Sequence, residues 1–161
     1  MASLKVLAIA VASGRAGYVY LQETKLLDWG MTVKATKDPA ELVAFVQSLI
    51  NDLKPDVVVT EKCDALCRKG KKARRLIAAI ADLASHNYVL DISLARPRHF
   101  PSKYEEAVHF VKRHPEITGY LPKKKRRIFD FEPRTMMIFE ALALAEQALI
   151  SPPEALAAAM G

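Results

Sequence analysis

The stretch VLAIAVASGRAGYVYL, residues 6–21, decides the fold: an apolar run breaks at Ser13 and Gly14 and resumes at once. Residues 4–12 form a continuous and partly β-branched apolar run, which is typical of a strand buried on both faces. Residues 17–23 predict a second strand after a glycine-containing turn, and residues 26–35 predict a third. The three short-linked segments are therefore expected to form an antiparallel meander.

Helices and strands alternate after this meander. Asp38 predicts a helix N-cap, and Pro39 suits the first helical position. The apolar periodicity that follows predicts these further elements: a helix ending at Lys54, a strand over 56–61, a helix over 74–87, a strand over 88–95 and a helix over 133–150. The order β-β-β-α-β-α-β-α predicts an α/β fold, with one mixed five-stranded sheet and helices on both of its faces.

The chain of 161 residues has the length of one domain with its own core. We expect a single domain over residues 1–150 and a short C-terminal tail over 151–161. Residues 96–131 contain four prolines and a basic run. This composition predicts a connector that lies outside the core.

The positive charge of the chain is concentrated in two runs. The formal net charge is +6, and 11 of the 24 lysines and arginines lie in RKGKKARR (68–75) and KKKRR (123–127). One such run can be the solvated end of a helix, but it also suits phosphate groups or anionic lipid. Two dense runs in one small domain favour nucleic acid as the partner.

Other partner classes have weaker support in the sequence. Cys63 and Cys67 have neither the spacing of a redox pair nor that of a zinc site, and reduced thiols suit a cytosolic protein. The apolar run near the N-terminus resembles a short signal sequence, but no stretch reaches the ~18 apolar residues of a membrane span. We therefore expect a soluble cytoplasmic protein without a membrane partner.

Two acidic residues are candidates for chemistry. Glu61 ends a strand otherwise rich in valine, and ligands of α/β sheets collect beyond strand ends, although a carboxylate there can also be solvated rim. Glu140 stands in the apolar segment MMIFEALALAE. Burial of such a carboxylate is unfavourable unless it finds a cation, a metal ion or a hydrogen-bond donor. The alternative is that Glu140 faces solvent.

Three motifs together resemble the RuvC-type Holliday junction resolvases of the ribonuclease H-like superfamily. VLAIAVASGRAGY is similar to the first strand of that family, I-L-G-I-D-P-G-S-R-x-x-G-Y. PDVVVTE matches the end of its fourth strand, P-D-x-x-x-x-E, and EALALA is similar to D-A-L-A-x-A in its last helix. The similarity covers residues 4–95 and 132–147 and implies a ribonuclease H-like fold.

The resemblance also implies a degenerate acidic site. In the family, carboxylates of the first strand, the fourth strand and the last helix bind two divalent ions, usually magnesium, at the scissile phosphate. Here Ala10 replaces the first-strand aspartate and Met137 replaces one helix acid, whereas Glu61 and Glu140 remain as candidate metal ligands. With half of the ligands missing, the ancestral reaction is expected to be lost or greatly slowed. Magnesium is the expected cofactor if the chain is active, and otherwise none.

Glu132 is a third candidate catalytic residue, because it lies next to the start of the last helix. It can stabilise the helix N-terminus by its charge, or it can replace a missing ligand. Eight residues separate it from Glu140, about 12 Å along a helix axis, which is too far for one shared ion unless the loop folds back. The structural role is therefore favoured for Glu132.

Three functions remain open on these grounds. The first is a nucleic-acid-binding protein, with DNA as the expected ligand. The second is a metal-dependent endonuclease that acts on branched or structured DNA through Glu61, Glu140 and Glu132. The third is a protein-interaction subunit, and the family resemblance also allows a homodimer. The candidate nucleic-acid contacts are Arg15, Lys62, Lys69, Lys71, Lys72, Arg74, Arg75, Lys123, Lys124, Lys125, Arg126, Arg127 and Arg134.

Overall fold

Strand β1 (Lys5–Ala12) is the central strand of a five-stranded sheet with the order β3-β2-β1-β4-β5. The computed structural model describes residues 4–63, 69–97, 99–121, 134–152 and 156–158. Strands β2 (Arg15–Gln22) and β3 (Lys25–Thr32) continue from β1 as an antiparallel meander. Strands β4 (Val57–Glu61) and β5 (Leu90–Leu94) run parallel to β1 on its other side. The predicted meander and mixed sheet are confirmed.

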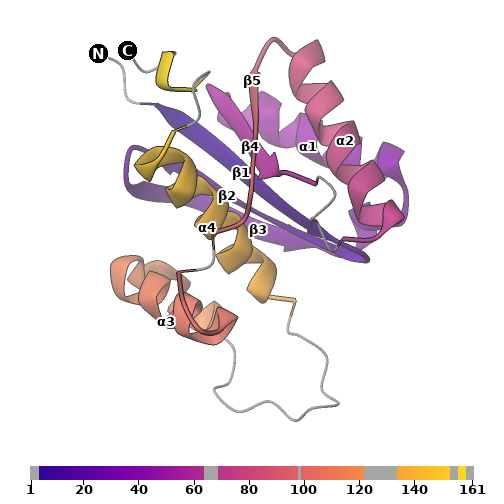
Figure 1. Cartoon of the computed structure of the whole chain (residues 1–161). Coiled ribbons are helices and arrows are strands. Elements are labelled where there is room, and N and C mark those ends of the chain that lie inside the picture. Colours follow the sequence, from indigo (N-terminus) through magenta and orange to yellow (C-terminus); the bar gives the residue numbers. More distant parts are fainter. Residues whose placement is uncertain (1–3, 64–68, 98, 122–133, 153–155, 159–161) are drawn as a thin grey trace.

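Helices cover both faces of this sheet (Figure 1). Helices α1 (Pro39–Leu53) and α2 (Lys71–His86) lie on one face, and α4 (Met136–Ile150) lies on the other. Helix α3 (Lys103–Arg113) packs against α4 on this second side. Successive side chains of β1 enter the two cores in turn, because side chains alternate across a strand. Leu7, Ile9 and Val11 pack with α1 and α2, whereas Val6, Ala8 and Ala10 pack with α4. This explains why the strand is apolar throughout.

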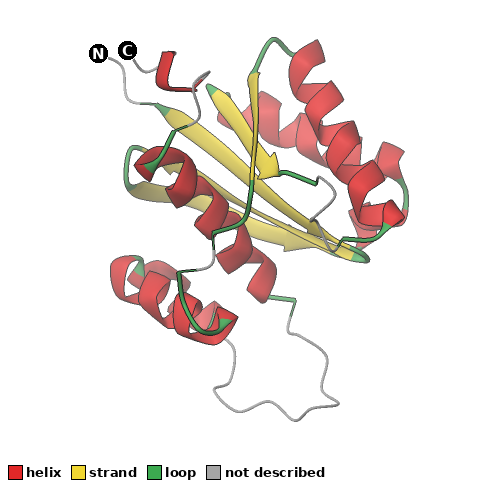
Figure 2. Ribbon diagram, in the orientation of Figure 1, coloured by secondary structure: helices red, strands yellow, loops and turns green. Residues whose placement is uncertain are grey.

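Local signals set the ends of α1. The Asp38 side chain accepts a hydrogen bond of 3.1 Å from the Ala40 N–H, and Pro39 is the first helical residue, as predicted. Lys54 ends the helix in the left-handed region at φ 51°. Two short 3₁₀ helices, η1 (Lys34–Lys37) and η2 (Pro115–Tyr120), and a helical turn at residues 156–158 complete the described elements (Figure 2).

Several predicted boundaries differ from the observed ones. The third strand ends at Thr32 instead of residue 35, because η1 begins at Lys34. Helix α2 begins at Lys71, three residues before the predicted start at residue 74. The first residues of α2 are basic and exposed, so the apolar periodicity that marks a helix begins only after its first turn.

The expectation that residues 96–131 lie outside the core is wrong for the described part of this segment. Ala107 and Phe110 of α3 and Ile117 of η2 are buried in the same core as α4. Leu156, in the predicted tail, is also fully buried there. Its four prolines and its basic run gave the segment 96–131 the composition of a connector, although α3 has an amphipathic sequence.

No described helix is long and apolar enough to cross a bilayer.

Candidate functional site

Ala10 and Glu61 lie at the same edge of the sheet, where β1 and β4 end. Ala8 pairs with Val59 in the parallel register, and Ala10 and Glu61 stand two residues further along their strands. The alternation of side chains puts both residues on the α4 side of the sheet. Ala10 is only 4% exposed and packs in the apolar core with Met137. The position that the resemblance assigns to an aspartate is therefore filled by core packing.

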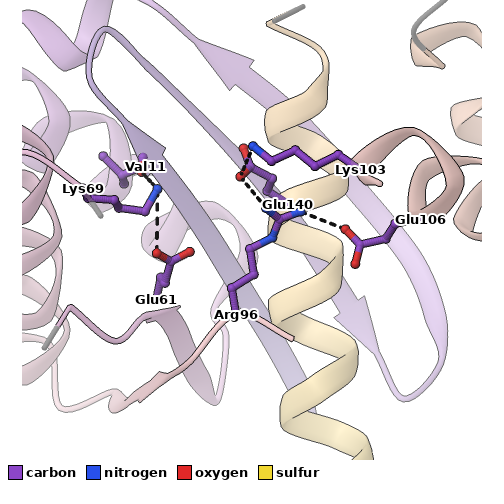
Figure 3. A network of polar contacts seen from close by, with 7 residues as sticks. All are labelled: Val11, Glu61, Lys69, Arg96, Lys103, Glu106 and Glu140. Carbon is purple, nitrogen blue, oxygen red and sulfur yellow. Dashed lines mark hydrogen bonds and ion pairs between the residues drawn. The ribbon is translucent and has the colours of Figure 1, made fainter. Parts of the chain in front are cut away.

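Lys69 places its ammonium group between the ends of β1 and β4 (Figure 3). Its Nζ atom donates a hydrogen bond of 2.6 Å to the carbonyl oxygen of Val11 and lies 3.9 Å from Oε2 of Glu61. The side chains of Lys69 and Glu61 are 18% and 17% exposed. Arg74 donates a hydrogen bond of 3.0 Å from Nε to the carbonyl oxygen of Lys69, which links Lys69 to the first turn of α2.

Glu140 is buried on α4 and bound by two cations. One of its carboxylate oxygens lies 3.1 Å from Nη1 of Arg96 and 3.2 Å from Nζ of Lys103. Arg96 also binds Glu106, with 2.9 Å between Nη2 and Oε1. The alternative that Glu140 faces solvent is wrong, since the residue is 6% exposed. The requirement for a cationic partner, which its apolar surroundings impose, is met by Arg96 and Lys103.

The balance of charge in this network depends on Glu106. Burial raises the pKa of the Glu106 carboxyl, whereas Arg96 opposes the rise and the charge of Glu140 adds to it. Two carboxylates and two cations thus share the space between α3, α4 and the end of β5. A hollow of about 220 Å³ opens beside them and is lined by Arg96, Pro97, Phe100, Pro101, Ser102, Lys103 and Glu106.

The donor set of this edge does not fit a pair of magnesium ions. Magnesium binds oxygen ligands, above all carboxylates and water. Ala10 offers a methyl group, Glu61 faces Lys69, and Glu140 faces Arg96 and Lys103. Among the described residues no group of three or more His, Cys, Asp and Glu side chains could hold a metal ion. Figure 3 shows the two acids in separate clusters, each with its own basic side chains.

A basic surface adjoins the same edge at the start of α2. Lys71, Lys72 and Arg75 are exposed in the first turns of the helix, and no acidic residue accompanies them there. Gly70 is the N-cap of this helix and provides no side-chain cap. The contacts of Lys69 with Val11 and Glu61 hold this helix start against the sheet.

The other predicted site residues are distributed around this edge or lie outside the described residues. Arg15 begins β2 beside the end of β1, and Lys62 follows β4, with its backbone N–H bonded to the Leu94 carbonyl. Arg134 is exposed two residues before α4. Glu132 and the run of Lys123, Lys124, Lys125, Arg126 and Arg127 lie outside the described residues.

The sequence reasoning missed Arg96, Lys103 and Glu106. Arg96 follows β5, which runs parallel to β4, so the same strand-end argument that singled out Glu61 could have found it. Arg96 lies in the segment 96–131, whose prolines and basic run predicted a connector. Lys103 and Glu106 share one face of α3 at helical spacing, a signal that was present in the sequence.

Comparison with known proteins supports the fold. No protein-family model matches the chain, and no curated protein matches its sequence. The structure of T. thermophilus RuvC in complex with a Holliday junction substrate is similar, with a TM-score of 0.57 and 15% identity over 92% of this chain and 97% of that chain.

The Fowlpox virus resolvase in complex with Holliday junction DNA gives a TM-score of 0.59 and 14% identity. The match covers 91% of this chain and 99% of the viral one. Identities this low bear on the fold alone. The strand order, the helices on both faces and these neighbours agree with the resemblance of the three motifs. The chain therefore has a RuvC-like ribonuclease H fold, the fold of the Holliday junction resolvases.

Proposed function

We propose that this protein binds nucleic acid, with branched DNA as the ligand, through the basic start of α2 and without metal-dependent cleavage. The observation that carries the proposal is the concentration of Lys71, Lys72 and Arg75 at the sheet edge that also holds Ala10 and Glu61. Phosphate backbones are bound mainly through lysine and arginine contacts of this kind.

The position of these cations favours binding over a purely structural role. A cation near a helix N-terminus opposes the helix dipole, which destabilises the helix by about 0.3–1 kcal/mol per charge. The same end offers backbone N–H groups to an anion, and phosphate groups suit such positions. The basic first turn of α2 is therefore unfavourable to the free protein and favourable to a complex with phosphate.

The pairing of the acids also supports this function. Lys69 offsets the charge of Glu61 at the edge where the DNA backbone would approach, and Arg96 and Lys103 offset that of Glu140. A phosphate can then approach without a divalent ion to screen the carboxylates. The two similar structures hold Holliday junctions, and this makes a four-way junction the first ligand to test.

The test compares two double variants in a titration of a labelled four-way DNA junction, followed by fluorescence anisotropy. Lys71→Gln/Lys72→Gln removes two charges from the proposed contact surface. Lys25→Gln/Lys54→Gln removes two exposed charges from the opposite edge, where β3 begins and α1 ends.

We expect the wild type to bind with a steep dependence on salt, about 0.9 in log–log slope for each phosphate neutralised. The first variant should lose between one and two units of this slope, whereas the control should retain it. Equal loss in both variants, or binding insensitive to salt, would overturn the proposed surface. Magnesium-dependent cleavage that Glu61→Gln abolishes would favour the endonuclease instead.

A further inference from the structure

We infer that the ammonium group of Lys69 is a resident cation of this site, and that it takes the place between β1 and β4 that a divalent metal ion would otherwise occupy. The inference goes beyond nucleic-acid binding and does not depend on it. It starts from the disagreement between the fold, which implies a metal site, and the side chains, which do not fit one.

The oxygen atoms around Lys69 are those that a hard cation prefers. Its Nζ atom is 2.6 Å from the backbone carbonyl oxygen of Val11 and 3.9 Å from a carboxylate oxygen of Glu61. Carbonyl and carboxylate oxygens are the usual protein ligands of divalent magnesium and calcium. Figure 3 shows the lysine reaching across from the α2 side to these two groups. The ammonium group thus satisfies an oxygen set that a metal ion would also use.

The lysine is held in this place by its backbone as well. It immediately precedes Gly70, the N-cap of α2, and its carbonyl oxygen accepts a hydrogen bond from Arg74. The side chain is mostly buried, at 18% exposed. A partly buried and anchored ammonium group keeps its position more firmly than a lysine on an open surface. It also repels any cation that approaches the same oxygens.

The second surviving acid follows the same principle. Glu140 forms ion pairs with Arg96, which follows the end of β5, and with Lys103 of α3. Both acids that the fold would use for metal are therefore balanced by basic side chains of the chain itself. It follows that removal of Lys69, and of no neighbouring lysine, should make the Glu61 carboxylate responsive to divalent ions.

The test measures thermal stability of the full chain with EDTA and with about 10 mM MnCl₂, without nucleic acid. Binding of Mn²⁺ is followed in parallel by the loss of the free-ion signal in electron paramagnetic resonance. Four proteins are compared: wild type, Lys69→Met, Lys72→Met as an exposed control from the same basic run, and Lys69→Met/Glu61→Gln. Because nucleic acid is absent, failure of this inference is distinguishable from failure of the proposed DNA binding.

Mn²⁺ should not change the Tm of the wild type or of Lys72→Met. In EDTA the Tm of Lys69→Met should be lower than that of the wild type, and Mn²⁺ should raise it by about 2–4 °C. Mn²⁺ should not raise the Tm of the double variant. The inference is overturned if Lys69→Met responds to Mn²⁺ no more than the wild type does.

A second comparison decides the matter even if Lys69→Met does not fold. Wild type and Glu61→Gln are then titrated with Mn²⁺ alone. A resident lysine predicts equally weak binding to both proteins. Mn²⁺ binding to the wild type that Glu61→Gln removes would contradict the inference, because the ion would share the site with the lysine.

Discussion

Gly17 of β2 lies directly beneath Met137 of α4, so close that a Cβ atom at position 17 would be 2.7 Å from the backbone carbon of Met137. Gly17 is also the partner of Ala10 across β1 and β2. Two small residues side by side therefore let the start of α4 rest on the sheet at the place where the resemblance expects an acidic site. At this point α4 packs closely against β2, and neither Ala10 nor Gly17 offers a carboxylate.

Substitution of Gly17 by alanine should destabilise the protein by about 1–3 kcal/mol, because the added methyl group meets helix backbone that must move as a unit. Urea denaturation followed by circular dichroism measures the change. Gly119→Ala is a matched control, since a Cβ at Gly119 meets no atom within 4 Å. A loss at position 17 no larger than at position 119 would show that α4 does not rest on β2 as described.

Glu140→Gln should destabilise the fold by about 1.5–3 kcal/mol, because Arg96 loses one charged partner and Lys103 loses the ion pair that Glu140 provides. The free energy of unfolding in urea is again the measurement. Glu105→Gln provides the control on α3, since Glu105 is exposed, and its loss should stay below about 0.5 kcal/mol. Equal effects at the two positions would argue against the buried network.

Asp91 on β5 provides a test of pH dependence. Burial raises the pKa of its carboxyl above the ordinary 3.8, and the charge of Asp82 adds to the rise. Its Oδ1 atom is buried and has no hydrogen-bond partner among the described residues. With the folded-state pKa above the unfolded one, the contribution of Asp91 to stability is complete below about pH 3.8 and is lost as the pH rises through the folded-state value.

Asp91→Asn removes this titration, so the variant should be more stable than the wild type at pH 7. The gain should shrink as the pH falls towards 4, because the wild-type carboxyl then takes up its proton. Thermal unfolding of both proteins over this pH range gives the difference directly. A difference that is constant with pH would contradict a raised pKa at Asp91.

Restoring an aspartate by Ala10→Asp should not produce a magnesium-dependent nuclease. The new carboxylate would enter apolar packing beside Met137, which should lower the free energy of unfolding by about 1–3 kcal/mol. Lys69 would still form its ion pair with Glu61. Thermal unfolding and incubation of a labelled four-way junction with Mg²⁺ provide the two readings. Strong magnesium-dependent cleavage by this single variant would mean that the other acids are free to bind metal.

The order of the elements could be predicted because each strand and helix carries its own local pattern. The unbroken apolar run of β1 predicted a strand buried on both faces, and the cap formed by Asp38 and Pro39 marked the start of α1. Glu61 could be singled out because it ends β4. These signals depend on short segments of chain, so they survive in a single sequence.

Which basic residue pairs with which acid could not be predicted in the same way. The pairs Glu61–Lys69 and Glu140–Arg96 depend on where Lys69 and Arg96 lie relative to the sheet, which no periodicity encodes. The burial of Glu140 illustrates this point. Its apolar neighbours predicted that it needed a cation, yet they did not indicate that Arg96 and Lys103 would supply it from a segment that was assigned to a connector.

The most direct test of the central claim is the affinity of the full chain for a four-way DNA junction, measured across a salt series in EDTA and again in Mg²⁺. Binding through lysine and arginine contacts predicts a steep salt dependence, dissociation constants in the two buffers that agree within about twofold, and intact DNA after incubation. Binding that requires Mg²⁺, or cleavage in Mg²⁺ that disappears in Glu61→Gln, would contradict it.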